Sequence, residues 1–105
     1  MRKYNFPTHI SGDTFNGVKF RITKDDVPVD LTSAIIKMYC KSSPNNVYEF
    51  SNTAENISIL DAADGMFEFK KQIIILPVRI YNYEIEITFP NEDVYTWVKG
   101  TWEII

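Results

Sequence analysis

The chain of 105 residues has one cysteine, one histidine and four glycines, and each scarcity removes a class of chemistry. Cys40 cannot form an intrachain disulfide, and within the alternating segment 34–41 we interpret it as a small buried hydrophobe rather than a reactive thiol. A single histidine leaves no His and Cys set that could bind zinc. The glycines form no phosphate-binding loop. The sequence therefore predicts no cofactor and no metal.

Excess basic charge and long apolar runs are also missing. The formal net charge is -3, with acidic and basic residues interspersed, so we predict no nucleic-acid partner. The longest apolar run, residues 73–76, is too short to span a bilayer. Residues 1–7 lack the apolar core of a signal peptide. We expect a soluble protein without a signal peptide and without a membrane partner.

Aromatic residues are abundant instead, with seven Phe, six Tyr and two Trp. Together with many Ile and Val, they favour strands. The clearest alternation covers residues 81–89, where odd positions are apolar and even positions are polar. We expect strands at 18–22, 34–41, 47–51, 57–60, 67–69, 81–89 and 94–105.

These segments, separated by short turns, predict a single all-β domain over residues 1–105. The expected architecture is a two-sheet antiparallel β-sandwich of about seven or eight strands, and a closed barrel is the alternative. Residues 1–12 form a loosely ordered arm or a first strand. Residues 42–46 form a turn, residues 71–80 cross between the sheets, and Gly100 is a plausible β-bulge.

Three clusters contain residue types that occur in catalytic or metal sites. His9, Ser11 and Asp13 are close in sequence, but no nucleophile motif accompanies them, and we interpret His9 as a surface or loop residue. The segment 61–65, with Asp61, Asp64 and Gly65, lacks the further ligands of a calcium loop and is predicted to be a turn. Asp25, Asp26 and Asp30 are assigned to a solvated turn rather than a cation site.

Glu84 and Glu86 are the remaining pair with catalytic spacing. Two residues apart on one strand, their side chains project from the same face about 7 Å apart. Such a pair hydrolyses glycosides only where burial raises one pKa, and these two lie on the polar face. We therefore predict that the protein is not an enzyme, has no catalytic residue and takes no small-molecule substrate.

Aromatic side chains are better candidates for binding. Of Trp97 and Trp102, we expect one in the core and the other at an interface, together with Tyr95 or Tyr39. The apolar end of the last strand, including Ile105, is suited to being covered by a partner. The predicted interface residues are Tyr39, Tyr95, Trp97 and Ile105.

Several short motifs carry a family resemblance. They are Gly12-Asp-Thr-Phe15, Val29-Asp-Leu-Thr32, the segment 61–67, Tyr81-Asn-Tyr83-Glu-Ile85-Glu-Ile87, and Thr96-Trp-Val-Lys-Gly100-Thr-Trp102. In this order they resemble small immunoglobulin-like domains of bacteriophage and prophage virion proteins, including the N-terminal domains of tail baseplate proteins. The chain departs from that pattern at Glu84, where the family usually has Asp, and at residues 78–80, which lack the family's glycine.

The resemblance implies an immunoglobulin-like fold without catalytic residues, in which Tyr81 or Tyr83 is the tyrosine corner. It also implies a non-catalytic structural or assembly protein of a tail, baseplate or other virion part, located in the virion or in the bacterial cytoplasm before assembly. Its partners are then other virion proteins or a second copy of the chain. The alternative is a carbohydrate-binding or adhesin-like module that uses Trp97 and Tyr95.

Overall fold

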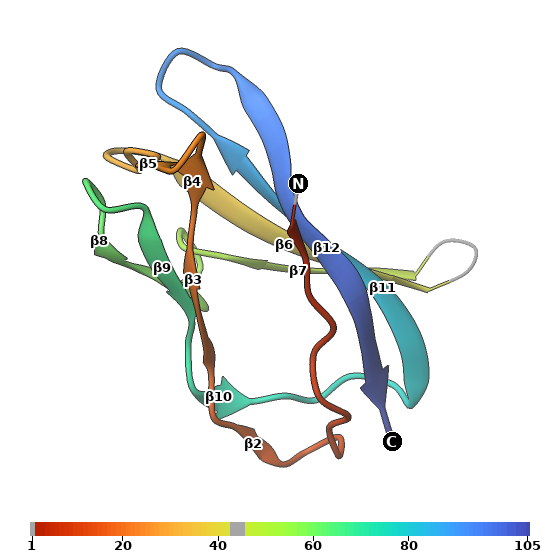
Figure 1. Ribbon diagram of the computed structural model, residues 1–105. Coiled ribbons are helices and arrows are strands. Elements are labelled where there is room, and N and C mark those ends of the chain that lie inside the picture. Colours follow the sequence, from red (N-terminus) through yellow and green to blue (C-terminus); the bar gives the residue numbers. More distant parts are fainter. Residues whose placement is uncertain (1, 43–45) are drawn as a thin grey trace.

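The computed structural model describes residues 2–42 and 46–105, and it is all-β as predicted (Figure 1). The described residues form twelve strands, seven of them four residues or longer. The strands are β1 Arg2–Lys3, β2 Thr14–Phe15, β3 Val18–Arg21, β4 Thr23–Lys24, β5 Val27–Pro28, β6 Ile35–Ser42, β7 Asn46–Ser51, β8 Ile57–Asp61, β9 Met66–Phe69, β10 Gln72–Ile73, β11 Arg79–Thr88 and β12 Val94–Ile104.

The larger sheet has five strands in the order β1-β12-β11-β6-β7. β11 pairs antiparallel with both β6 and β12, whereas β1 runs parallel to β12. On β11 the four odd-numbered residues from Tyr81 to Ile87 are at most 1% exposed, and their even-numbered neighbours lie on the outer face. The alternation predicted for this strand is therefore confirmed.

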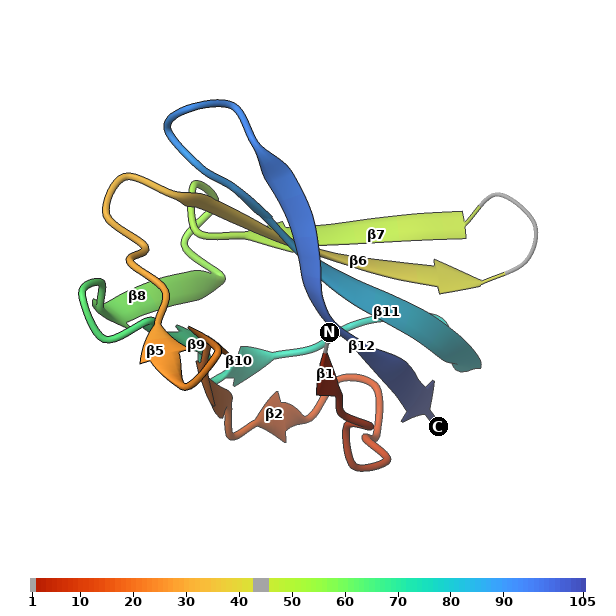
Figure 2. The same cartoon turned by 45° about the horizontal axis from the view of Figure 1, so that its top comes forward.

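The opposite layer contains the three-stranded sheet β3-β9-β8 and the short pair β10-β2 (Figure 2). A further small hairpin joins β4 to β5 through Asp25 and Asp26, with φ angles of 53° and 64°. Two consecutive residues with positive φ are typical of the tight turns that match strand twist, and Asp tolerates this conformation better than most residues. Among the described residues no strand pairing joins the two larger sheets, an arrangement consistent with the predicted sandwich rather than a closed barrel.

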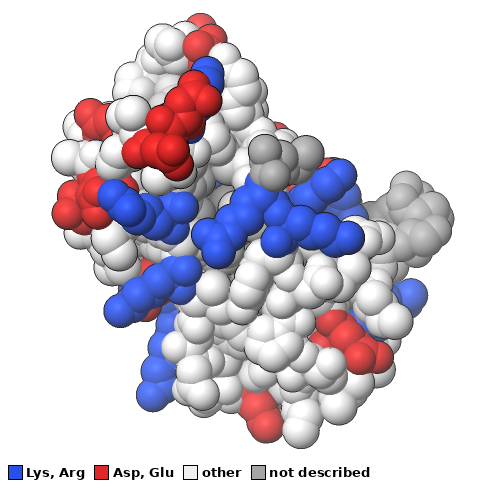
Figure 3. Space-filling view, viewed as in Figure 1, with Lys and Arg blue, Asp and Glu red and all other residues white. Residues whose placement is uncertain are grey.

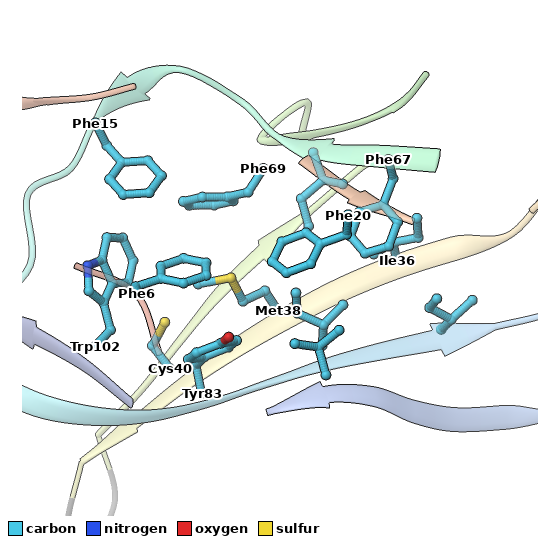
Figure 4. Packing of buried hydrophobic residues seen from close by; sticks show 14 of the residues in the cluster. Phe6, Phe15, Phe20, Ile36, Met38, Cys40, Phe67, Phe69, Tyr83 and Trp102 are labelled. Atoms are coloured by element: carbon cyan, nitrogen blue, oxygen red, sulfur yellow. The ribbon is translucent and has the colours of Figure 1, made fainter. Parts of the chain in front are cut away.

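The core lies between the two layers and is rich in aromatic rings (Figure 4). Phe69 of β9 meets Trp102 of β12 edge to face, with ring centroids 5.9 Å apart. Phe15 also reaches Trp102, at 5.2 Å. Burying one such side chain stabilises the fold by about 1.5–3 kcal/mol, so these contacts hold the layers together.

The N-terminal segment lies along β12 beyond β1. The backbone N–H groups of Tyr4 and Phe6 donate to the oxygens of Lys99 and Thr101, both at 3.0 Å. Phe6 inserts into the core, with its ring centroid 4.9 Å from that of Trp102. Residues 2–11 are thus tied to the larger sheet by backbone bonds and by an aromatic anchor.

The bulge predicted at Gly100 is wrong. Gly100 pairs regularly with Tyr83, and the register shift of β12 occurs instead at Trp97, between the pairs Ile85–Val98 and Glu86–Thr96. Gly100 serves a different purpose, since a Cβ there would collide with the backbone oxygen of Tyr4. The absence of a side chain lets the N-terminal segment approach β12 closely.

The connections mostly follow the expected pattern. Residues 43–45 of the predicted turn lie outside the described residues, and the flanking Ser42 and Asn46 pair with each other. Residues 74–78 cross from β10 to β11 without regular pairing. β11 begins at Arg79, two residues before the predicted start.

Candidate functional site

His9, Ser11 and Asp13 form no catalytic relay. The Nε2 of His9 donates to the backbone oxygen of Asp13 at 2.9 Å, and the Ser11 hydroxyl donates to the oxygen of Leu76 at 2.7 Å. The expected surface position of His9 is wrong, because its side chain is buried, with 9% of the residue exposed. Both side chains satisfy backbone carbonyls where the N-terminal segment meets the crossing segment, so their role is structural.

Glu84 and Glu86 lie on the outer face of the larger sheet among basic residues. A carboxylate oxygen of Glu84 is 3.7 Å from the Nζ of Lys41 on the neighbouring strand. Glu86 is opposite Lys37 in the pairing of β11 with β6. Such cross-strand pairs on a half-exposed face balance charge and contribute little to stability.

Three carboxylates of the acidic turns, those of Asp30, Asp61 and Asp64, accept hydrogen bonds from the protein itself. Asp61 accepts from the backbone N–H of Asp64 at 3.2 Å, and Asp64 pairs with Arg21 at 2.7 Å. Asp30 accepts two bonds from Thr32, and these bonds lower the pKa of its carboxyl group. Within residues 2–42 and 46–105, no three His, Cys, Asp or Glu side chains gather as a metal site would require.

Cys40 lies in the core and is fully buried. Burial raises the pKa of its thiol to about 12, because a thiolate would lose its hydration there. The thiol is therefore neutral at physiological pH, and a neutral buried thiol is a poor nucleophile.

The two candidate tyrosines of β11 make different contacts. The hydroxyl of Tyr81 donates to the backbone oxygen of Pro77 at 2.8 Å, four residues upstream, which is the geometry of a tyrosine corner. The hydroxyl of Tyr83 donates to the backbone oxygen of Tyr4 and so ties the N-terminal segment to the sheet. Burial raises the pKa of both phenols.

The four predicted interface residues lie in three different places. Tyr95 is 54% exposed and contacts the half-buried Trp97 edge to face, with ring centroids 6.4 Å apart. Tyr39 is half-buried on the outer face of the larger sheet, opposite Glu49 and Glu84. Ile105 is 52% exposed beyond the far end of β12, about 30 Å of extended strand from Tyr95. Trp102 is the core tryptophan.

A cluster of exposed aliphatic side chains was missed by the sequence analysis, apart from Ile105. We call it the aliphatic end, and its members are Ile10, Ile73, Ile75, Val78, Ile80 and Ile105, each more than half exposed. The three segments that carry them meet at one end of the molecule, where the N–H of Ser11 donates to the oxygen of Ile105 and that of Gly12 to the oxygen of Ile74. The lower part of Figure 3 shows few charged side chains there.

The sequence did hold a signal for this cluster. In residues 73–76 every residue is apolar, and only Ile74 and Leu76 can be buried when an extended segment covers a core on one side. Ile73 and Ile75 therefore point away from the core and stay exposed. An isolated exposed aliphatic residue is ordinary, whereas six gathered at one end make a candidate contact surface.

No protein-family model and no curated protein sequence matches this chain. Nor do the described residues include a helix of the length and apolarity needed to traverse a bilayer.

Proposed function

We propose that this chain is a non-catalytic structural or assembly protein of a bacteriophage or prophage particle that acts through protein–protein contacts. The observation that carries the proposal is the aliphatic end. It gathers six exposed aliphatic side chains from three chain segments at one end of the molecule. Hydration of such a surface is unfavourable, and a protein partner that covers it removes this cost.

The strand order supports the family resemblance. An immunoglobulin-type sandwich of the variable kind has strands G, F, C and C′ adjacent in one sheet and B, E and D in the other. Here β12, β11, β6 and β7 follow the first order, and β3, β9 and β8 follow the second. The hydrogen bond from Tyr81 to Pro77 occupies the place of the tyrosine corner at the start of strand F.

We infer that a second copy of the chain is one partner of the aliphatic end. Structural proteins of particles act in many copies, and a surface that meets itself about a two-fold axis needs only to be self-complementary. An apolar surface meets this condition without charge matching. Ile75 and Ile80, at 78% and 64% exposed, are two of the side chains that such a contact would bury.

A carbohydrate-binding module is less favoured by the geometry. Sugars stack on aromatic rings that present their faces to solvent. The ring planes of Tyr95 and Trp97 are 71° apart, so the two rings form no common flat platform. Trp97 is also half-buried.

The proposal is tested on particles released by induction of a bacterial strain that carries the gene. After density-gradient purification, we expect the chain to sediment with the particles in multiple copies, as measured by quantitative mass spectrometry. A chain found only in the particle-free supernatant would contradict a virion role. Tail or capsid genes beside its own gene would support it independently.

A further inference from the structure

A cleft lies between the strands β3 and β4 of one layer and the first part of β12 in the other. Two adjoining cavities of about 280 and 410 Å³ share Thr23 and Trp97 as lining residues. Phe20 contributes to the lining of the first cavity and Tyr95 to that of the second. The cleft is far from the aliphatic end, since Tyr95 and Ile105 lie near opposite ends of β12.

One wall of the cleft is an open strand edge. β11 occupies one side of β12 along its whole length, but on the other side the described pairing begins only where Arg2 meets Val98. For residues 94–96, no described strand lies on that side. The backbone N–H and C=O groups that point that way are therefore available to a further strand.

Trp97 adds a polar group that lacks a partner. Its Nε1 is inaccessible to solvent and makes no hydrogen bond with any described residue. A buried donor without a partner costs free energy, and no hydrogen bond to a described residue fixes the Trp97 ring that lines both cavities.

The charges at the cleft favour an acidic ligand. Arg2 and Arg21 line the first cavity and Lys24 lines the second. Figure 3 shows basic side chains across the middle of this face. Of the three, Arg21 is engaged by Asp64 at 2.7 Å, but both of those side chains are exposed, so that a ligand carboxylate can compete for the guanidinium.

We propose that this cleft binds an extended, acidic peptide segment of a partner protein, which adds as a short strand to β12 at residues 94–96. The bound peptide lies beside residues 94–96 of β12, on the same side of β12 that β1 occupies beside Val98 and Lys99. Its acidic side chains contact Arg2, Arg21 and Lys24, and an apolar side chain enters the cavity beside Trp97. Strand addition uses main-chain hydrogen bonds for affinity and side-chain contacts for selectivity.

The probe is a blocked peptide of about eight residues with alternating glutamate and valine, long enough to cover the open edge and both cavities. Titration is followed by calorimetry and by tryptophan fluorescence, because Trp97 lies in the cleft while Trp102 is shielded in the core. We expect saturable binding with a changed fluorescence. The same peptide with lysine in place of glutamate is expected not to bind.

Two further probes separate strand addition from simple charge attraction. A glutamate–valine peptide methylated on its central backbone nitrogens keeps its charge but cannot donate to β12, and we expect its binding to be lost. An oligothymidylate of similar length tests the other polyanion that a basic, aromatic cleft accepts. Equal binding of the methylated peptide, or tighter binding of the oligonucleotide, would overturn the proposal.

Variants locate the site. Arg21→Glu combined with Lys24→Glu is expected to weaken peptide binding about tenfold or more, whereas Asp64→Asn, which frees Arg21, should strengthen it. Lys71→Glu, an exposed charge reversal outside the cleft, is the matched control. Circular dichroism checks that each variant is folded. Unchanged binding by the first variant, or equal weakening by the control, would refute the assignment.

The cleft and the aliphatic end can be tested separately. The variant Ile75→Lys with Ile80→Lys should bind the peptide as the wild type does, because neither residue lies near the cleft. Loss of peptide binding in that variant would contradict a cleft that acts independently. If the peptide does not bind, the proposal for the aliphatic end still stands. If the aliphatic end does not mediate association, the proposal for the cleft still stands.

Discussion

Tyr81 donates its hydroxyl to the backbone oxygen of Pro77 at 2.8 Å and so joins the first part of β11 to the end of the crossing segment. The ring of Tyr81 is fully buried, which places this hydrogen bond at the border between the core and the aliphatic end. Among the described residues no strand pairs with residues 75–78, so this hydrogen bond holds the end of the segment, while backbone bonds to Gly12 and Asp13 hold Ile74.

Replacement of Tyr81 by Phe tests this link. The ring stays buried, but the oxygen of Pro77 loses its donor, so we expect the free energy of unfolding to fall by about 1–2 kcal/mol in urea denaturation. Tyr95→Phe removes an exposed hydroxyl and should change stability by less than about 0.5 kcal/mol. Equal effects of the two substitutions would argue against the link.

Gly100→Ala tests the close approach of the N-terminal segment. The added methyl group has no room beside the backbone oxygen of Tyr4, so the segment must move away from β12. We expect a loss of about 2 kcal/mol or more of stability, within the range of overpacked sites. Gly100→Ala should speed amide exchange at Tyr4 and Phe6, relative to the wild type, more than it speeds exchange at Ile85. The neighbouring Thr101→Ala, at an exposed position, serves as control and should leave exchange unchanged.

Features that depend on residues close together in the sequence were predicted, and features that depend on distant residues were not. The inward residues of β11 were predicted because strand alternation is local and depends on neighbours two positions away. The turn at residues 61–65 was also predicted from local chemistry. Gly65 has a φ of 69°, and a side chain there would meet the backbone oxygens of Ile22 and Val29.

The errors concern contacts between distant parts of the chain. The proximity of Tyr4 determines the role of Gly100, and the burial of His9 depends on its bridge to Ile104. Neither relationship leaves a periodic pattern in the sequence. The candidate sites were hidden for the same reason: the cleft combines Arg2, Arg21 and Trp97, which only the folding of the two layers brings together.

The burial of Cys40 makes the free energy of unfolding depend on pH in the alkaline range. Its thiol pKa is about 12 in the folded protein and near the ordinary value of 9.0 when unfolded. Since the unfolded thiol ionises first, the contribution of the neutral thiol is complete below about pH 9 and is lost as the pH rises towards about 12. We expect the free energy of unfolding to fall in this window by up to about 1.4 kcal/mol per pH unit from this group.

The control is Cys40→Ala, measured by urea denaturation at several pH values. The variant should be less stable at neutral pH because a small cavity remains, but its stability should fall less steeply between about pH 9 and 10, because both proteins share the same tyrosines and differ only in the thiol. Tyr81 and Tyr83 steepen the decline of both proteins at higher pH, because burial raises their pKa values as well. Identical slopes for the two proteins in the lower interval would contradict a buried, neutral thiol.

The central claim is that the aliphatic end is a protein contact surface, and sedimentation velocity over micromolar to near-millimolar concentrations tests it most directly. The wild type is predicted to associate reversibly with rising concentration. Ile75→Lys with Ile80→Lys should sediment as the 12.2 kDa monomer throughout. Val27→Lys, at a position that is 62% exposed on the β4–β5 hairpin, should behave as the wild type. A wild type that stays monomeric at every concentration, or a double variant that associates equally well, would contradict the claim.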